Sequence, residues 1–340
     1  MIPVAVLTGF LGSGKTTLLA HLLRQPEFSR TAVLINEFGE IGLDHELVET
    51  SDDSFVELQT GCLCCKVRND LAQTLADMLR RRDCGELPRF DRIVIETSGL
   101  ADPAPILQTL MTDAAIAGHL MLSDVVTTVD AVTGSGALDR EEISVKQVAL
   151  ADRLVLTKSD LANGAQPELL DRLAQLNAAA PVLRAHHGRI DPQRVFDSGT
   201  YDPRSKSLDA KTWLAEEVSA QKHLHDRHDA DITTYALVRE RPIRAVALTL
   251  FLEAVAEHCG ADLLRLKAIV QIAECPDRPA VLHGVQHVFH APAWLERWPS
   301  QDRRSRIVFI TRRIPRRWVE TLFDALDAEV RDVEADAPRQ

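Results

Sequence analysis

The sequence lacks a hydrophobic run long enough to cross a bilayer, and it is poor in positive charge. Its most apolar stretch, residues 245–256, contains Glu253 and falls short of the ~20 residues that a membrane-spanning helix needs. The formal net charge is -11, from 39 basic and 50 acidic side chains. That balance argues against general binding to nucleic-acid phosphates or to an anionic membrane. We therefore expect no nucleic-acid partner and no membrane.

We also expect no secretory leader, because a strand-like run begins at residue 2 with no basic segment before it. We expect a cytoplasmic protein. Cysteine is scarce, with six residues in all, yet Cys62, Cys64 and Cys65 fall together. In a reducing compartment such a cluster indicates metal binding or redox chemistry rather than a disulfide framework.

What the chain does have is the composition of a folded protein, with 45% hydrophobic and 26% charged residues. Its 340 residues are enough for two domains. Over residues 1–195, β-branched runs alternate with amphipathic segments, which predicts an α/β domain with a mostly parallel sheet. We expect strands at 3–8, 32–36, 92–97, 125–130, 153–157 and 181–184, and helices at 16–24, 70–81, 103–118 and 166–179.

The chain changes character at about residue 196. Residues 196–230 are polar and contain His223, His225 and His228, so they predict a solvated linker rather than a metal store. After it we expect a smaller α+β domain over 231–335. Its predicted strands lie at 232–239, 267–273, 280–285 and 306–311, and its predicted helices at 246–259 and 315–330.

A phosphate-binding loop is predicted between the first strand and the first helix. Residues 9–17 read GFLGSGKTT and fit the pattern GxxxxGK[ST], in which backbone N–H groups close around nucleotide phosphates. We assign Lys15 to the phosphates as a point charge and Thr16 to Mg²⁺. The other nucleotide-binding residues of this loop are Gly9, Gly12, Ser13, Gly14 and Thr17.

The strand predicted at 92–97 ends close to an acid and is followed by a glycine. We expect Glu96 to stand behind the ligands of Mg²⁺, and the Gly99 N–H to reach the γ-phosphate, so that this loop senses that group. Taken alone, the motif could also be a solvated strand end followed by a turn.

Base recognition is assigned to Thr157, Lys158 and Asp160, which end or follow the strand predicted at 153–157. The Asp160 carboxylate can accept hydrogen bonds from guanine N1–H and from the exocyclic amine, a donor pair that adenine lacks. The Lys158 stem would cover the base plane. The alternative interpretation of Asp160 is a helix N-cap.

The clustered cysteines offer soft sulfur ligands, which suit Zn²⁺, Co²⁺ or Cu⁺ better than Mg²⁺. In an extended chain Cys62 and Cys64 share one face, and Cys65 joins them only if the backbone turns. A tetrahedral ion then needs another ligand, for which Glu37, His119 and water are candidates. If one coordination position of the metal stayed open to water, the ion would exchange more readily than in a closed four-ligand site. A redox dithiol and packed core cysteines are the alternatives.

Together these motifs resemble those of the CobW-type GTPases, a family of P-loop metallochaperones that includes zinc chaperones, and they are most similar to its YjiA branch. The resemblance covers nearly the whole chain. It is carried by GFLGSGKTTLL at 9–19, NEFGE at 36–40, GCLCC at 61–65, ETSGLADPAPI at 96–106, TKSD at 157–160, GVQHVF at 284–289 and RSRIVFI at 304–310.

The resemblance implies a P-loop fold, hydrolysis of GTP to GDP and phosphate, and delivery of a metal to a client metalloprotein. The implied metal is zinc, with Co²⁺ and Ni²⁺ as alternatives, held at the three cysteines. Glu37 is implied to lie near both nucleotide and metal, in the first switch segment. A nucleotide- or metal-dependent homodimer is compatible with this picture. The implied catalytic residues are Lys15, Thr16, Glu37 and Glu96, of which Thr16 and Glu37 are also metal ligands.

We expect hydrolysis to relax segments 36–40 and 96–99 and thereby to change the metal affinity. No residue is an obvious general base, and Glu37, Glu40 and Asp130 are the candidates for orienting water. Thr157 stands where guanine-binding loops commonly carry Asn.

Two other functions remain open: a P-loop small-molecule kinase, which would need neither Asp160 nor the thiolates, and a GTP-dependent binding module with redox-sensing cysteines.

Overall fold

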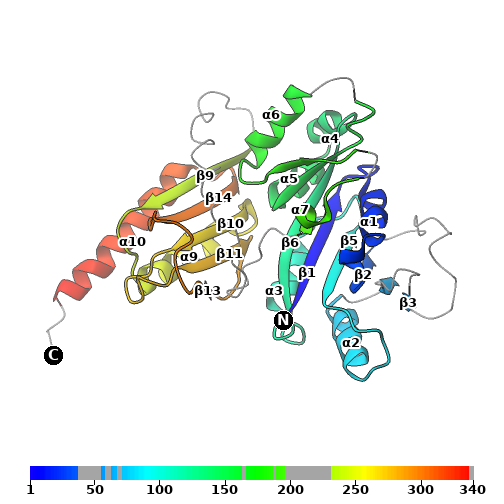
Figure 1. Cartoon of the computed structure of the whole chain (residues 1–340). Coiled ribbons are helices and arrows are strands. Elements are labelled where there is room, and N and C mark those ends of the chain that lie inside the picture. The colour runs from blue at the N-terminus through cyan, green and yellow to red at the C-terminus, as the bar shows by residue number, and fades with distance from the viewer. Residues whose placement is uncertain are drawn as a thin grey trace. The chain divides into compact units, whose positions relative to one another are not determined.

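The structure is a computed structural model, and its described residues form two compact units (Figure 1). One unit lies within Met1–Ala174 and Ala180–Thr200, and the other within Gln175–Ala179 and Tyr201–Gln340. The residues that the structure describes are 1–36, 55–57, 63–66, 71–162, 166–186, 189–196 and 231–336.

An eight-stranded sheet forms the centre of the first unit, in the order β3-β4-β2-β5-β1-β6-β7-β8. Neighbouring strands run parallel except for the pair β3 and β4, so the α/β fold with a mostly parallel sheet is confirmed. The strands are β1 (Ile2–Gly9), β2 (Thr31–Asn36), β3 (Phe55–Glu57), β4 (Leu63–Lys66), β5 (Arg92–Thr97), β6 (Leu120–Asp130), β7 (Arg153–Thr157) and β8 (Val182–Arg184).

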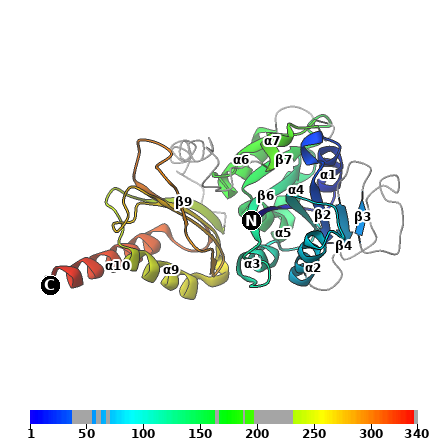
Figure 2. The ribbon, with the colours of Figure 1, turned by 60° about the horizontal axis from the view of Figure 1, so that its bottom comes forward.

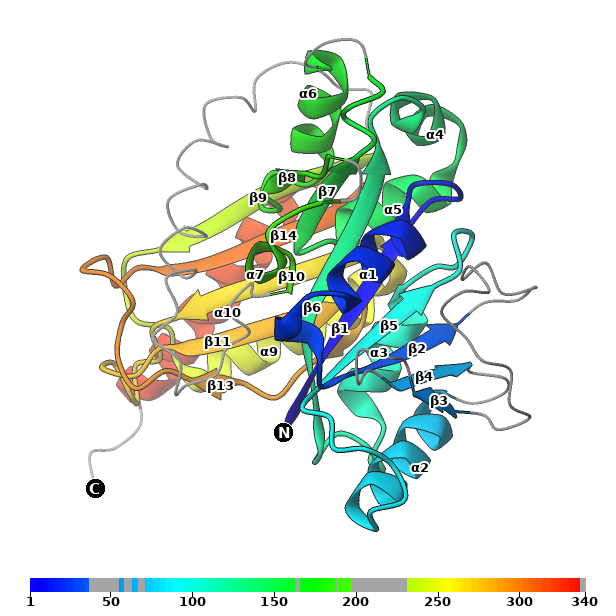
Figure 3. The ribbon, with the colours of Figure 1, turned by 45° about the vertical axis from the view of Figure 1, so that its right-hand side comes forward.

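Helices cover both faces of this sheet, with α1 and α7 on one face and α3 and α5 on the other (Figure 3). On the first face, Leu18 and Leu22 of α1 pack with Phe196 of α7 against Val94 and Val126 of the sheet. The helices are α1 (Lys15–Leu23), α2 (Leu71–Asp83), α3 (Ala104–Thr112), α4 (Gly134–Arg140), α5 (Glu142–Leu150), α6 (Pro167–Leu176) and α7 (Pro192–Phe196), with a 3₁₀ turn at Pro26–Phe28.

Strand β1 lies between β5 and β6 and is buried from Val4 onward. A strand covered on both faces needs apolar residues on both, which explains its unbroken run of hydrophobic side chains. Because β1, β5, β6 and β7 are parallel, their carboxyl ends meet at one edge of the sheet. Loops that follow these four strands are therefore brought together there.

Among the elements predicted for this unit, two differ most from their predicted bounds. Strand β6 begins at Leu120 instead of 125, and its register with β1 shifts so that Ser123 is an extra residue. Ser123 and the buried Asp124 interrupt the apolar pattern, which is why the first half of the strand was missed. Helix α3 ends at Thr112 rather than 118, because the Asp113 side chain accepts the Ala115 N–H (2.9 Å) and closes a turn.

The second unit is an antiparallel sheet in the order β12-β11-β10-β14-β9, with β13 beside β11. Helices α9 and α10 cover one face of it (Figure 2), so the smaller α+β domain is also confirmed. Its elements are β9 (Ile232–Arg239), α9 (Ala245–Cys259), a 3₁₀ turn (Gly260–Asp262), β10 (Leu263–Val270), β11 (Ala280–Val285), β12 (Val288–Phe289), β13 (Ala293–Trp294), β14 (Ser305–Arg312) and α10 (Arg316–Asp336).

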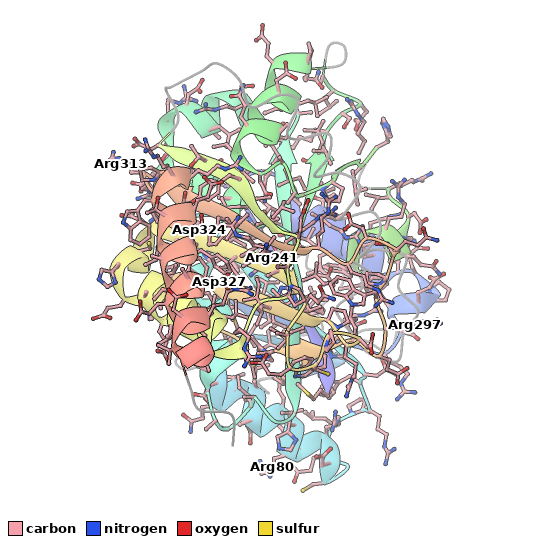
Figure 4. The ribbon with its side chains drawn as sticks, turned by 90° about the vertical axis from the view of Figure 1, so that its left-hand side faces the viewer. Arg80, Arg241, Arg297, Arg313, Asp324 and Asp327 are labelled. Atoms are coloured by element: carbon pink, nitrogen blue, oxygen red, sulfur yellow. The ribbon has the colours of Figure 1, made fainter. Side chains whose placement is uncertain are left out.

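Aromatic rings join the helices of this unit to its sheet. Phe251 of α9 meets Phe309 of β14 and Phe323 of α10 edge-on, with ring centroids 6.2 Å and 5.1 Å apart. Outside this core, Asp324 of α10 pairs with Arg239 at 2.6 Å (Figure 4). No helix in the described part of the chain is both long enough and apolar enough to span a membrane.

Candidate functional site

The predicted nucleotide-binding residues all lie at the carboxyl edge of the parallel sheet. The phosphate loop follows β1, Gly99 follows β5, and Asp130 ends β6. The base loop 157–160 begins at the last residue of β7. Since the strand order is β5-β1-β6-β7, these segments form one continuous row of loops (Figure 3). This edge of the sheet is where an α/β protein of this type binds its ligand.

Glycines shape the phosphate loop. Gly9 has φ = 142°, and a Cβ on it would come within 2.3 Å of the Thr128 side-chain oxygen. Gly14 has φ = 87° and precedes the first residue of α1, so a side chain there would be strained. Gly12 also has a positive φ, 72°. The loop can adopt this turn only because these positions have no side chain, and a turn of this kind lets backbone N–H groups approach a phosphate.

Lys15 is the first residue of α1, and it is almost fully buried. Its ammonium group donates a 2.8 Å hydrogen bond to the Gly9 carbonyl and a longer one, 3.4 Å, to the Phe10 carbonyl. The side chain therefore curls back over the loop in which it stands. This places a positive charge beside the helix N-terminus, where phosphate groups are favoured.

Thr16 and Glu96 are joined directly, although they come from α1 and β5. The Thr16 hydroxyl donates a 2.6 Å hydrogen bond to Glu96 Oε1. Glu96 is 1% exposed, whereas Thr16 is half-buried and Thr17 is exposed. A hydroxyl with a carboxylate behind it is an all-oxygen donor set of the kind that Mg²⁺ takes. The structure thus brings these two predicted residues into direct contact.

Gly99 lies against the phosphate loop. A Cβ on Gly99 would come within 2.7 Å of the Leu11 backbone nitrogen. The loop that contains Gly99 is held from behind by Gln147 of α5, whose amide donates to the carbonyls of Gly99 (3.2 Å) and Ala101 (3.1 Å). Gln147 is fully buried. No sequence pattern pointed to Gln147, because neither its helix nor its burial was predicted.

Buried hydroxyl groups tie the strand ends to one another. The Thr97 hydroxyl donates to the Thr8 hydroxyl at 2.8 Å, which connects β5 to β1. The Ser13 hydroxyl lies 2.7 Å from that of Thr128, which connects the phosphate loop to β6. Sequence patterns missed Thr8, Thr97 and Thr128 because threonine is also an ordinary strand former. These links fix the loop relative to the sheet.

Thr157 connects the base loop to the phosphate loop. Its hydroxyl is buried and lies 2.7 Å from the Ser13 carbonyl and 3.2 Å from the Val129 carbonyl. The hydroxyl can therefore reach the backbone of the phosphate loop from this position. Asp160 is exposed. Lys158 has a left-handed backbone, with φ = 53°.

Asp130, a candidate for orienting water, forms hydrogen bonds through both of its carboxylate oxygens. One of its oxygens, Oδ2, accepts a 2.6 Å hydrogen bond from Lys158 Nζ. The other accepts the N–H groups of Val132 (2.8 Å) and Thr133 (3.3 Å). Burial opposes ionisation, but the bonds from Lys158 and the backbone outweigh it, and the pKa of Asp130 lies below its ordinary value. Both oxygens of Asp130 are thus bonded, one to the base loop and the other to the start of α4.

The metal-site residues fall largely outside the described part of the chain. Glu37, Glu40, Cys62 and the linker histidines are not among the described residues. Cys64 and Cys65 lie in β4, where their backbones pair with Val33 and Leu34 of β2. The next residue of β4, Lys66, pairs with Ile35 of β2, and Ile35 pairs on its other side with Glu96 of β5. The register thus brings the carboxyl end of β4 to within about 10 Å, two strand spacings, of the Glu96 backbone.

His119 does not belong to this region. It precedes β6, and its carbonyl accepts the Ile2 N–H at 2.8 Å, at the amino edge of the sheet. Four strand spacings separate β6 from β4, or about 19 Å. The expectation that His119 completes a site with Cys64 and Cys65 is therefore wrong. No three His, Cys, Asp or Glu side chains within the described ranges are grouped closely enough to hold a metal ion.

Comparison with protein families gives two matches along the chain. The family described as CobW/HypB/UreG, nucleotide-binding domain, matches residues 3–184. The cobalamin synthesis protein cobW C-terminal domain matches residues 232–327. The first match covers the parallel sheet with all of its strand-end loops, and the second covers the antiparallel sheet.

Individual relatives extend over most of the chain. The zinc chaperone YjiA of Escherichia coli is 34% identical over 328 residues, which are 96% of this chain and 98% of that protein. The zinc-regulated GTPase metalloprotein activator 1 of Schizosaccharomyces pombe is 33% identical over 69% of this chain and 61% of its own length. Among solved structures, the Zn(II)-bound YjiA GTPase from E. coli matches with a TM-score of 0.73 and 31% identity, covering 96% of this chain and 98% of that one.

Proposed function

Because the chain belongs to the CobW/HypB/UreG family of nucleotide-binding proteins, we propose that it is a GTP-hydrolysing metallochaperone that carries zinc to a client metalloprotein. Its relatives are named zinc chaperone and zinc-regulated GTPase metalloprotein activator, and a zinc-bound GTPase shares its fold. The observation that carries the proposal is the 2.6 Å bond between Thr16 and Glu96 beside the phosphate loop. It supports a nucleotide site that also holds a divalent cation.

In this proposal the phosphate loop and Lys15 bind the phosphates of GTP, and Thr16 holds Mg²⁺ with Glu96 behind it. When bound, Mg²⁺ neutralises charge on the transferred phosphoryl group. The Gly99 N–H is assigned to the γ-phosphate, and the close approach of Gly99 to the phosphate loop supports this assignment. Asp160 selects guanine. Phosphoryl transfer of this kind depends on positioning and charge, so slow turnover without a partner is expected.

The cargo site is proposed at Cys62, Cys64 and Cys65, with Glu37 as an oxygen ligand. Thiolates select zinc, or cobalt and nickel in its place, over magnesium. The register of β4 with β2, and of β2 with β5, supplies a backbone route from Cys65 to the strand that ends at Glu96. A change at the γ-phosphate can reach the thiolates along it. We also propose that the protein acts in the cytoplasm, where reducing conditions keep such thiols available.

The energy needed for this coupling is small. A tenfold change in metal affinity corresponds to ~1.4 kcal/mol of differential binding, which lies within what phosphate contacts can supply. Linkage requires that zinc change the affinity for GTP by the same factor. The relatives are named zinc chaperone and zinc-regulated GTPase metalloprotein activator and not kinase, so the kinase alternative receives no support from them.

The proposal is tested by anaerobic titration of the protein with Co²⁺ and Zn²⁺, loaded in turn with a non-hydrolysable GTP analogue and with GDP. We expect a cobalt–thiolate absorption band and metal affinities that differ roughly tenfold between the two states. The double variant Cys64→Ser/Cys65→Ser should lose the band. Cys84→Ser, which changes an exposed cysteine outside the cluster, is the matched control and should keep it.

Two results would count against the chaperone. Equal metal affinity in the GTP-analogue and GDP states would remove the coupling between hydrolysis and release. An unchanged cobalt band in the double variant would remove the cysteines from the metal site and favour the redox-sensing module.

A further inference from the structure

The carboxyl ends of β6 and β7 carry a charged pair that the hydrolysis mechanism does not use. Asp130 ends β6 and is paired with Thr157 in the sheet register, so it stands beside the start of the base loop. Its carboxylate lies 2.6 Å from Lys158 Nζ, and its side chain is only 7% exposed. The Ala131 N–H donates to the Thr157 carbonyl (3.0 Å), which extends the strand pairing by one residue.

Both partners of this pair are fixed by their surroundings. On the acidic side, the N–H groups of Val132 and Thr133 hold the second carboxylate oxygen in an Asx turn ahead of α4. On the basic side, the Lys158 carbonyl accepts the Leu161 N–H at 3.0 Å, and the Lys158 backbone is left-handed. The lysine is therefore held at its backbone and at its ammonium group, with the aliphatic stem between them.

We propose that Asp130 is a positioning residue, which holds the Lys158 stem extended as the platform on which guanine is bound. This rests on the proposed GTP-binding function and adds to it a residue that acts through Lys158 and does not itself touch the nucleotide.

The physical reason is pre-organisation. A lysine side chain has many rotamers, and ordering it on binding costs free energy that the ligand must supply. The ion pair orders the stem before the nucleotide arrives. Because the base is common to GTP and GDP, losing this order weakens both nucleotides by one factor. A residue that orients water would instead lower kcat and leave nucleotide affinity unchanged.

The main test is Asp130→Asn, with dissociation constants for GDP and for a non-hydrolysable GTP analogue measured by calorimetry. The Asn carbonyl can keep the two backbone bonds of the Asx turn, while its amide faces the lysine as a second donor. We expect both affinities to fall by roughly three- to tenfold, with their ratio unchanged. Thermal unfolding of the variant without nucleotide shows whether it is folded.

Asp113→Asn is the matched control. Asp113 also forms an Asx turn, with the Ala115 N–H at 2.9 Å, but it lies before the amino end of β6. This variant removes the same charge and should bind nucleotides as the wild type does.

A double-mutant cycle with Lys158→Met separates positioning from a general structural effect. If Asp130 acts through Lys158, Asp130→Asn has no further effect on GDP affinity in the Lys158→Met background. An equal loss in both backgrounds would overturn the proposal, as would a fall in kcat with unchanged affinities. Should Asp130→Asn not fold, Lys158→Met alone must weaken GDP and the GTP analogue equally, and a weakening confined to one overturns the proposal. Failure of the proposed function is distinct, since the wild type would then show no preference for guanine nucleotides.

Discussion

At the scale of single residues, Gly99 shows how little room separates the loop after β5 from the predicted phosphate loop. An added Cβ would come within 2.7 Å of the Leu11 nitrogen and 2.8 Å of its Cα, and backbone atoms cannot move aside as the end of a flexible side chain can. Either the loop after β5 or the phosphate loop must shift. Because Gly99 is proposed to donate its N–H to the γ-phosphate, the shift should act on GTP more than on GDP.

We therefore predict that Gly99→Ala weakens GTP-analogue binding roughly tenfold, since overpacking costs ~1–3 kcal/mol. GDP binding should fall less. Gly118→Ala is the matched control, because a Cβ on Gly118 meets nothing within 4 Å. Calorimetric titration of the three proteins with both nucleotides provides the measurement. The idea fails if Gly99→Ala binds the GTP analogue and GDP with wild-type affinities.

Predictability from sequence also differs from one residue to the next. Thr16 and Glu96 could be named because their motifs fix the residue type and its place, at the start of α1 and at the end of β5. Gln147 could not, since nothing in a local pattern shows that a buried amide will meet two loop carbonyls from another helix. The same holds for the pairing of Asp130 with Lys158, which join only when β6 and β7 lie side by side.

At the scale of elements, regular segments followed the sequence pattern and irregular ones did not. Strands β9 and β11 have the predicted bounds, because their alternating apolar residues end at clear turns. Strand β10 was predicted at 267–273 but runs from Leu263 to Val270. Its last predicted residues include Ile272, which instead bridges to Ile243 outside the sheet. An apolar residue such as Ile272 can thus make the predicted strand longer than the real one, because its side chain fits the pattern while its backbone pairs elsewhere.

The entry to β14 is stabilised by charge. Asp302 accepts side-chain and backbone bonds from Arg304, and Arg306 lies beside it, so its pKa falls to about 2. Because this pKa is below the unfolded value of about 3.9, the stabilisation is complete above that pH and disappears as the pH falls through about 2.

We predict that Asp302→Asn lowers the unfolding free energy by about 1 kcal/mol at pH 7, a modest value because the carboxylate is partly exposed. The difference from wild type should vanish toward pH 2. Urea unfolding followed by tryptophan fluorescence at several pH values would measure it. Asp277→Asn, at an exposed ion pair with Arg303, is the control and should change stability little. A difference that persists undiminished at pH 2 would contradict the assignment.

At the scale of the whole molecule, the two units have separate cores. One is built around Leu18, Phe28 and Val94, and the other around Phe251, Phe309 and Phe323. The predicted nucleotide-binding residues that the structure describes all belong to the first unit. Binding energy should therefore stabilise that unit directly.

We predict that GDP at 100 times its dissociation constant stabilises the first unit by ~2.7 kcal/mol. Backbone amides of this unit that exchange only when the whole unit unfolds should then exchange about 100-fold more slowly. Peptides from β1, β5, β6 and β7 should show this protection in hydrogen-exchange mass spectrometry. Peptides from β10 and β14 should exchange at unchanged rates. Equal protection of both sets would mean that the two units unfold as one.

The Thr157 hydroxyl, placed on the Ser13 carbonyl, has a consequence for ligands smaller than a whole nucleotide. It joins the loop proposed to bind the base to the loop proposed to bind the phosphates, so the two halves of the proposed nucleotide site are coupled. Guanosine alone or pyrophosphate alone should then bind more weakly than their shares of the GDP affinity imply. Fragment-sized inhibitors would gain most from spanning both halves.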